Sequence, residues 1–238
     1  MNERKNNTMK RLKDNVTIIT GAGKGIGFGV ASAFAKEGSN LVITGRNENR
    51  LLEAKAKLEK EYGVKVLALV ADGADEEKIK EVIAKTVATF GKINTLINNA
   101  QASKSGLSLI EHTKEDFDLA IYSGLYATFF YMREAFPYLK ESKGSVINFA
   151  SGAGMYGKPG QSSYGAAKEG IRGLSRVAAT EWARDGINVN VVCPLAWTSQ
   201  LEQFKMAYPD AFDKNVHMPP MGHFGDSEYE IGRVCVQL

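Results

Sequence analysis

The chain has 238 residues, in which 30 Lys and Arg side chains nearly balance 27 Asp and Glu side chains. This length fits one α/β domain with a well-buried core. The net charge of +3 comes from cations and anions that are interspersed along the chain, which excludes an extended basic surface for nucleic acid. No apolar stretch is long enough to span a membrane, and we expect a cytoplasmic protein.

Cysteine and histidine usage indicates neither a disulfide framework nor a metal site. Cys193 lies in the apolar run 189–193, where we expect a buried thiol. Cys235 is distant in the sequence, and the three histidines are scattered. Two isolated cysteines are typical of a protein from the reducing cytosol. We therefore predict no bound metal.

We predict a flexible segment over residues 1–13, which is polar and basic and lacks the apolar region of a signal peptide. Residues 14–238 are predicted to form one domain. Apolar, β-branched runs alternate in it with helical patterns, and this alternation predicts a three-layer, doubly wound parallel sheet. The predicted strands are 16–20, 40–45, 64–70, 93–98, 145–150 and 187–193. The predicted helices are 25–37, 47–62, 75–90, 114–139, 163–184 and 226–237.

The first predicted strand leads directly into a glycine-rich turn and then a helix, which is the context that a dinucleotide-binding loop requires. Glycines let the backbone turn tightly and approach a pyrophosphate at the positive end of the helix. A turn without a ligand is the alternative, but four alternating glycines favour a Rossmann-type nucleotide site. The predicted cofactor contacts of this loop are Gly21, Gly23, Lys24, Gly25, Ile26 and Gly27.

The end of the second predicted strand bears on which dinucleotide binds. An enzyme that uses NAD usually has an acidic residue here, which holds the ribose 2′-hydroxyl. This chain has Gly45 followed by Arg46, and a guanidinium suits a 2′-phosphate. Lys24 adds a second positive charge. Both cations could be ordinary surface residues, but no acidic residue competes with them, so NADP is predicted, with NAD as the alternative.

Tyr164 and Lys168 are four residues apart, so on a helix they share one face. An ammonium beside a phenol favours the phenolate, and we expect it to lower the tyrosine pKa from about 10. Such a tyrosine can exchange a proton with an alcohol or carbonyl oxygen at neutral pH. Taken alone, the pair could be an aromatic residue and a snorkelling lysine on an amphipathic helix. The glycine loop makes a catalytic pair the stronger interpretation.

Together these motifs resemble the short-chain dehydrogenase/reductase family over about residues 14–200. The segments 20–27, 98–100 and 194–199 look like its cofactor loop, its Asn-Asn-Ala-Gly segment and its nicotinamide-contacting segment. The resemblance implies that Ser151, Tyr164 and Lys168 are catalytic. The further cofactor contacts that it implies are Asp72 (at the adenine), Gly73, Asn99, Ala100, Tyr164, Lys168, Pro194, Thr198 and Ser199.

Residues 195–225 contain no clear strand but many apolar side chains, and in the family the equivalent segment covers the substrate. We predict an irregular lid rather than a disordered loop, because so apolar a loop would be costly to expose. Its predicted inner surface is formed by Trp197, Leu201, Phe204, Met206, Tyr208, Phe212 and Met221. The predicted substrate contacts are Gln101, Ala153, Tyr156, Trp197 and Leu201.

The chain ends at Leu238, whereas family members usually continue for about twenty residues into a last edge strand. We expect that strand to be lacking here, which bears on oligomer contacts and on the substrate pocket. Family resemblance implies a homotetramer or a homodimer.

Three positions depart from the family pattern: Gln101 and Leu195 stand where glycines are usual, and Gly124 stands where an asparagine completes the proton relay. Glycine cannot supply the side-chain hydrogen bonds of asparagine. A water held by backbone groups, or the neighbouring Ser123, could replace it.

With these departures the chain resembles a subgroup, the bacterial 12α-hydroxysteroid dehydrogenases. The resemblance extends over segments 97–102, 122–129 and 145–154. The resemblance implies an NADP-dependent oxidoreductase acting on the 12α-hydroxyl of a bile acid, a small hydrophobic steroid. One alternative is a reductase of 3-oxoacyl thioesters or other ketones from the same family. The other is a non-catalytic NADP-binding sensor, which Gly124 and the short C-terminus would favour.

Overall fold

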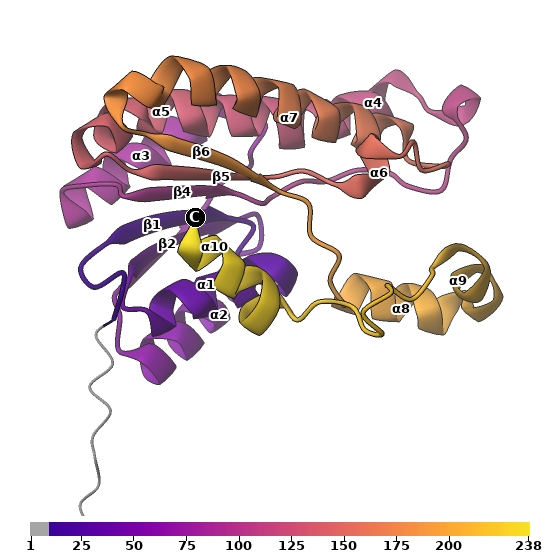
Figure 1. Ribbon diagram of the computed structural model, residues 1–238, viewed down its shortest axis with the longest axis horizontal. Helices are drawn as coiled ribbons and strands as arrows, with labels where there is room; N and C mark the ends of the chain where they lie inside the picture. The colour runs from indigo at the N-terminus through magenta and orange to yellow at the C-terminus, as the bar shows by residue number, and fades with distance from the viewer. Residues whose placement is uncertain (1–9) are drawn as a thin grey trace, which may run out of the picture.

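The computed structural model describes residues 10–238, and they form one parallel sheet with helices on both faces (Figure 1). The strand order is β3-β2-β1-β4-β5-β6, and all five neighbouring pairs are parallel. The predicted doubly wound sheet is thereby confirmed. The strands are β1 (Val16–Thr20), β2 (Asn40–Gly45), β3 (Val66–Val70), β4 (Thr95–Asn98), β5 (Ser145–Phe149) and β6 (Asn188–Val192).

Two helical layers cover the sheet. In Figure 1, α1 (Gly25–Lys36), α2 (Glu48–Tyr62) and α10 (Arg233–Gln237) lie on one face, and their buried side chains share one apolar cluster. On the other face, α3 (Glu76–Phe90), α5 (Ala127–Ser142) and α7 (Ser162–Trp182) share a second cluster. The sheet between them is buried on both sides, which is why its central strands are continuous apolar runs rather than alternating ones.

Local signals in the sequence set the helix ends. Helices α2 and α3 begin after Asn47 and Asp75, whose side chains accept hydrogen bonds from backbone N–H groups three residues on. Both helices end at a glycine in the left-handed conformation, Gly63 and Gly91, with φ of 69° and 76°. These caps are why the predicted boundaries of both helices agree with the structure to within a residue.

Two of the predicted helices contain a wide, π-helical turn. The predicted helix 114–139 consists of α4 (Lys114–Ala120), the π-helical turn η2 (Ile121–Tyr126) and α5. The predicted helix 226–237 consists of the π-helical turn η4 (Ser227–Gly232) and α10. Such turns are frequent at functional sites. Three short helices lie in the connections between the larger elements: η1 (Leu109–Glu111), α6 (Gly152–Met155) and η3 (Ala183–Asp185).

The prediction of an irregular segment over 195–225 is wrong, because the segment contains α8 (Ser199–Ala207) and α9 (Pro209–Asn215). Both helices are short and lie apart from the two main layers in Figure 1. Helices of two turns carry too few residues for a clear period in the sequence. An isolated bridge between Ala196 and Gly225 brings the two ends of the segment together.

Cys193 is exposed, not buried as predicted. It follows β6, which is an edge strand of the sheet formed by residues 10–238 and has no fully buried residue. The apolar run before Cys193 is therefore only partly buried, with Val192 and Val189 packed against the edges of the two apolar clusters.

The described part of the predicted N-terminal segment is attached to the domain. Leu12 N donates to Glu37 O at 2.9 Å, and Arg11 Nη1 donates to Gln237 Oε1 at 2.6 Å. At the other end, Ser145 Oγ donates to the backbone oxygen of Leu238 at 3.2 Å. Within residues 10–238, no helix combines the length and apolarity needed to cross a bilayer.

Candidate active site

The glycine loop after β1 takes a backbone path that few other residues tolerate. Gly21 and Gly25 have φ of +69° and +59°, in the left-handed region. A β-carbon at Gly27 would lie 2.5 Å from Gly21 O and 2.6 Å from Asn99 Nδ2. Only glycine therefore allows α1 to start this close to the ends of β1 and β4.

The N-terminus of α1 is open, unlike those of α2 and α3. Its N-cap residue, Lys24, makes no capping side-chain hydrogen bond, so within the described chain the first N–H groups of the helix lack a side-chain cap and carry its positive dipole. A β-carbon at Gly25 would find no atom within 4 Å. The loop thus presents free N–H groups to open space, which fits the pyrophosphate of a dinucleotide.

Two cations stand beside this loop. Lys24 and Arg46 are both exposed, and neither forms an ion pair within residues 10–238. Gly45, the last residue of β2, brings no acidic group between them. The charges are available to an anionic ligand, as a 2′-phosphate requires.

Asn99 and Ala100 tie the end of β4 to the glycine loop. Thr20 Oγ1 accepts hydrogen bonds from the backbone N–H groups of Asn99 and Ala100, both at 3.0 Å. Asn99 Nδ2 donates to Thr20 O at 2.9 Å. Sequence reasoning did not assign this role to Thr20, although a hydroxyl at the last position of a buried strand could have indicated it.

Asp72 and Gly73 form the turn after β3. Asp72 is exposed, and its Oδ1 accepts from Ala74 N at 3.0 Å. A β-carbon at Gly73 would lie 2.8 Å from Ala127 Cβ, so glycine lets this turn pack against the start of α5. Asp72 is thus held by its own turn, and its second carboxylate oxygen forms no hydrogen bond or ion pair within residues 10–238.

The three predicted catalytic residues meet beyond the end of β5. Ser151 is the N-cap of α6, and its Oγ accepts from Ala153 N at 3.2 Å. Tyr164 and Lys168 lie on the same face of α7, with Lys168 Nζ 5.5 Å from the centre of the Tyr164 ring. Lys168 Nζ donates to Phe149 O at 2.6 Å, and the side chain is only 4% exposed.

Burial, rather than mutual charge, dominates the two pKa values. Burial raises the pKa of Tyr164, and a hydrogen bond with Ser151 offsets only part of this effect. Burial lowers the pKa of Lys168 from 10.5 to about 7. The prediction of a lowered tyrosine pKa is therefore wrong for this structure, because burial of the phenol itself penalises its charged form.

A chain of buried polar side chains holds α7 against the sheet. Asn98 Nδ2 donates to Asn148 Oδ1 at 2.8 Å, and Asn148 Nδ2 donates to Ser175 Oγ at 2.9 Å. Ser175 in turn donates to Ile171 O at 2.6 Å. These bonds join β4, β5 and the helix that carries Tyr164. Sequence reasoning did not find this chain, though asparagines inside apolar strands were its visible sign.

The predicted lid residues do not all face inward. Trp197 packs against Phe212 and Phe224, at centroid distances of 6.1 and 5.6 Å, and Phe204 lies 6.2 Å from Phe212. Met206, Tyr208 and Met221 are 77%, 63% and 59% exposed, which contradicts their predicted place on an inner surface. The aromatic side chains of the segment pack against one another, whereas Met206, Tyr208 and Met221 stay exposed to solvent.

The remaining predicted contacts vary in their surroundings. Tyr156 is 84% exposed, and Pro194 is half-buried after β6. Thr198 Oγ1 accepts from Leu201 N at 3.2 Å, so this hydroxyl caps α8. The side chain of Ser199 lies outside the described part of the structure.

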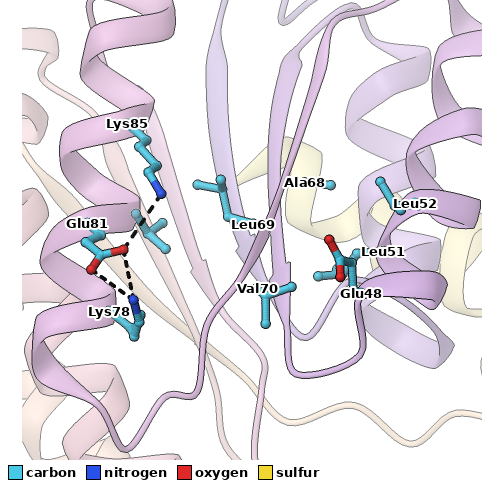
Figure 2. Close-up of a pocket in the computed structure, with 10 residues that line it drawn as sticks. Glu48, Leu51, Leu52, Ala68, Leu69, Val70, Lys78, Glu81 and Lys85 are labelled. Carbon is cyan, nitrogen blue, oxygen red and sulfur yellow. Dashed lines mark hydrogen bonds and ion pairs between the residues drawn. The ribbon is translucent and has the colours of Figure 1, made fainter.

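The pocket in Figure 2 is separate from these residues. It has a volume of about 260 Å³ and lies beside the edge strand β3, between Leu51 of α2 and the Lys78–Glu81 ion pair of α3 (Figure 2). None of Ser151, Tyr164 or Lys168 lines it.

Comparison with known proteins shows the family to which the chain belongs. A family model described as short chain dehydrogenase matches residues 15–207. The chain belongs to the short-chain dehydrogenase family. It is 65% identical over 229 residues to a 12alpha-hydroxysteroid dehydrogenase from a Clostridium species, covering 94% of this chain and 88% of the relative. It is 35% identical to a 3-oxoacyl-[acyl-carrier-protein] reductase from Thermotoga maritima, covering 96% and 91%.

Solved structures of other short-chain dehydrogenases share the fold. Levodione reductase superimposes with a TM-score of 0.88 at 30% identity, covering 95% of this chain and 90% of that chain. L-Sorbose reductase from Gluconobacter frateurii, complexed with NADPH and L-sorbose, gives 0.88 at 26% identity, covering 96% and 90%. This short-chain dehydrogenase is thus an oxidoreductase that acts on CH–OH groups with a nicotinamide cofactor.

Proposed function

We propose that this enzyme transfers hydride between NADP and a secondary alcohol or ketone, and that its substrate is the 12α-hydroxyl group of a bile acid. The observation that carries the proposal is the 65% identity with the Clostridium 12alpha-hydroxysteroid dehydrogenase over 94% of the chain. The complete trio of Ser151, Tyr164 and Lys168 supports catalysis and speaks against a non-catalytic sensor.

Each member of the trio has a distinct chemical task. The nicotinamide, when bound, supplies the hydride acceptor or donor. In oxidation, the alcohol oxygen gives its proton to the Tyr164 oxygen as the carbon loses hydride, and the product is a ketone. Ser151 donates a hydrogen bond to the reacting oxygen and shares its developing charge. Lys168 would bind the nicotinamide ribose and relay protons to and from Tyr164.

The raised pKa of Tyr164 determines how the rates of oxidation and reduction should change with pH. A phenol with a raised pKa is protonated at neutral pH and can donate to a ketone oxygen. Oxidation needs the phenolate, so its rate should increase as the pH rises above neutrality. Reduction should show the opposite trend.

Preference for NADP rests on the two exposed cations, Lys24 and Arg46, beside the uncapped end of α1. A guanidinium can donate two parallel hydrogen bonds to a 2′-phosphate, which a 2′-hydroxyl cannot accept as strongly. NAD would lose these charge-assisted bonds and bind more weakly.

The test of substrate is formation of NADPH, followed by its absorbance, with cholate, deoxycholate or chenodeoxycholate as the alcohol. Turnover of the first two alone would establish oxidation at the 12α position, because chenodeoxycholate lacks that hydroxyl. Turnover of none of them, with reduction of a 3-oxoacyl thioester instead, would favour the second candidate, which the Thermotoga relative supports.

We further infer that the enzyme works in the cytoplasm as a homodimer or a homotetramer, in line with its family resemblance. The mass in solution, measured by light scattering, would decide between the two assemblies and a monomer.

A further inference from the structure

The side chain of Gln101 lies directly against Gly124. Gly124 is buried in the π-helical turn η2. A β-carbon at Gly124 would lie 2.7 Å from Gln101 Cδ, 2.9 Å from its Oε1 and 3.0 Å from its Nε2. The Gln101 carboxamide therefore lies where a side chain at 124 would begin, and the two departures from the family pattern form a matched pair.

The carboxamide of Gln101 is buried and has no protein partner. Within residues 10–238, its Nε2 donates no hydrogen bond and its Oε1 accepts none. An amide offers two donors and an acceptor, and leaving them unsatisfied is costly. A carboxamide retained in such a place therefore binds a group from outside the chain.

The backbone on both sides of Gln101 is fixed, so the position of the carboxamide is set by the fold. Ala100 N donates to Thr20 Oγ1 at 3.0 Å, and Ala102 N donates to Ser123 Oγ at 3.0 Å. Ser123 in turn directs its single proton to the carbonyl oxygen of Ala102 or of Leu119. Its hydroxyl therefore holds this segment to η2. The alternative that Ser123 replaces the relay asparagine is thus not supported.

The turn η2 packs directly on the catalytic helix. A β-carbon at Gly170 of α7 would lie 2.7 Å from Leu125 Cδ2, and Gly170 is two residues from Lys168. Within residues 10–238, Lys168 Nζ has one acceptor, Phe149 O. A protonated lysine has three donors, so this nitrogen has capacity for further hydrogen bonds.

We propose that Gln101 is a positioning residue of the proton relay: its carboxamide holds a water molecule between Lys168 and the solvent, in place of an asparagine at 124. In oxidation, the proton that Tyr164 takes from the alcohol passes by way of Lys168 to this water and out. In reduction it travels inward along the same path. Gln101 stays neutral and breaks no bond. The inference rests on the proposed dehydrogenase function but on no particular substrate.

Three variants test the relay. Gln101→Met keeps the length of the side chain but removes its hydrogen bonds. The double variant Gln101→Gly with Gly124→Asn moves a carboxamide to position 124. Gly124→Asn alone forces two carboxamides into one space and serves as the matched control. All are assayed as cofactor-loaded enzymes with the alcohol that the unaltered enzyme oxidises.

Gln101→Met is expected to lower kcat by on the order of 10–100-fold, with KM for the alcohol and for NADP within about twofold. Its solvent deuterium isotope effect on kcat should increase, because proton release becomes limiting. The double variant should recover most of kcat, and Gly124→Asn alone should not.

A packing role would give a different pattern. If Gln101→Met retains kcat and its isotope effect, the relay is overturned. It is overturned equally if Gln101→Met loses kcat together with a fall in Tm and the double variant does not recover. The proposal predicts a Tm that is unchanged within about 2 °C, since the lost hydrogen bonds are to a water molecule and not to protein groups.

The experiments distinguish failure of the relay hypothesis from failure of the substrate assignment. An enzyme that ignores cholate but reduces a 3-oxoacyl thioester would reject the bile acid, and the variants would then be compared on the thioester. A crystal structure of the NADP complex adds a readout without turnover. A water bonded to Gln101 and Lys168 is expected, and direct pairing of the carboxamide with protein groups would refute the relay.

Discussion

Replacing Lys168 by methionine is expected to stabilise the folded enzyme at neutral pH while it abolishes turnover. Lys168 is 4% exposed, and burial lowers its pKa from 10.5 to about 7. At about 1.4 kcal/mol for each pH unit, this corresponds to a destabilisation of about 5 kcal/mol. Methionine has a similar length and carries no charge to desolvate.

The loss of one hydrogen bond opposes this gain. Lys168 Nζ donates to Phe149 O at 2.6 Å, and a buried carbonyl without its donor costs about 1–3 kcal/mol. The variant should therefore exceed the unaltered enzyme in free energy of unfolding by about 2–4 kcal/mol at pH 7.

The difference should depend on pH in a defined direction. Between pH 7 and 10.5 the unfolded chain holds the Lys168 proton and the folded protein does not, so stability rises with pH in this window. From pH 7 to 9 the rise is about 2–3 kcal/mol. Methionine does not titrate, so the advantage of the variant should shrink by this amount.

Urea unfolding of both proteins without cofactor, followed by tryptophan fluorescence at pH 7 and pH 9, measures the effect. Other titrating groups cancel in the difference between the proteins. Lys57→Met, at an exposed lysine, is the control and should give the same difference at both pH values. A pH-independent difference for Lys168→Met would refute the buried, partly neutral lysine.

Three further outcomes follow from the site. Tyr164→Phe should lower kcat by at least about 1,000-fold, through loss of the proton donor, while the Kd for NADPH measured by fluorescence changes little; near-normal turnover would end its catalytic assignment. Arg46→Asp should lower kcat/KM for NADP by on the order of 100-fold and raise that for NAD; unchanged cofactor preference would remove Arg46 from the 2′-phosphate site. Gly27→Ala should lower both Tm and NADP affinity, because its β-carbon would lie 2.5 Å from Gly21 O. Gly173→Ala in α7, with no atom within 4 Å, should instead raise Tm, and equal effects of the two would contradict the close approach at Gly27.

The sheet and its main helices were predictable because their signals are local. Continuous apolar runs such as 16–20 indicate strands buried on both faces. Asn47 and Gly63 mark the two ends of α2 through hydrogen bonds within a few residues. The family resemblance, which the comparisons confirm, rested on motifs of this kind.

The two short helices within residues 195–225 were missed because they carry no comparable local signal. Their stability comes from packing among Trp197, Phe204 and Phe212 rather than from a repeated apolar pattern. Sequence reasoning recognised the apolar character of this segment but not which of its residues would be left outside.

The sequence by itself determined the order of strands and helices, the glycine loop and the spacing of Tyr164 and Lys168, since each depends on neighbours along the chain. Tertiary structure decided the electrostatics of the site. Burial of Tyr164 and Lys168 depends on what the fold places around them, and burial of the phenol reverses the pKa direction expected for Tyr164. Tertiary structure also brought Gln101 against Gly124, 23 residues along the sequence. That contact was invisible in the sequence, because it exists only once the segment after β4 is bonded to η2.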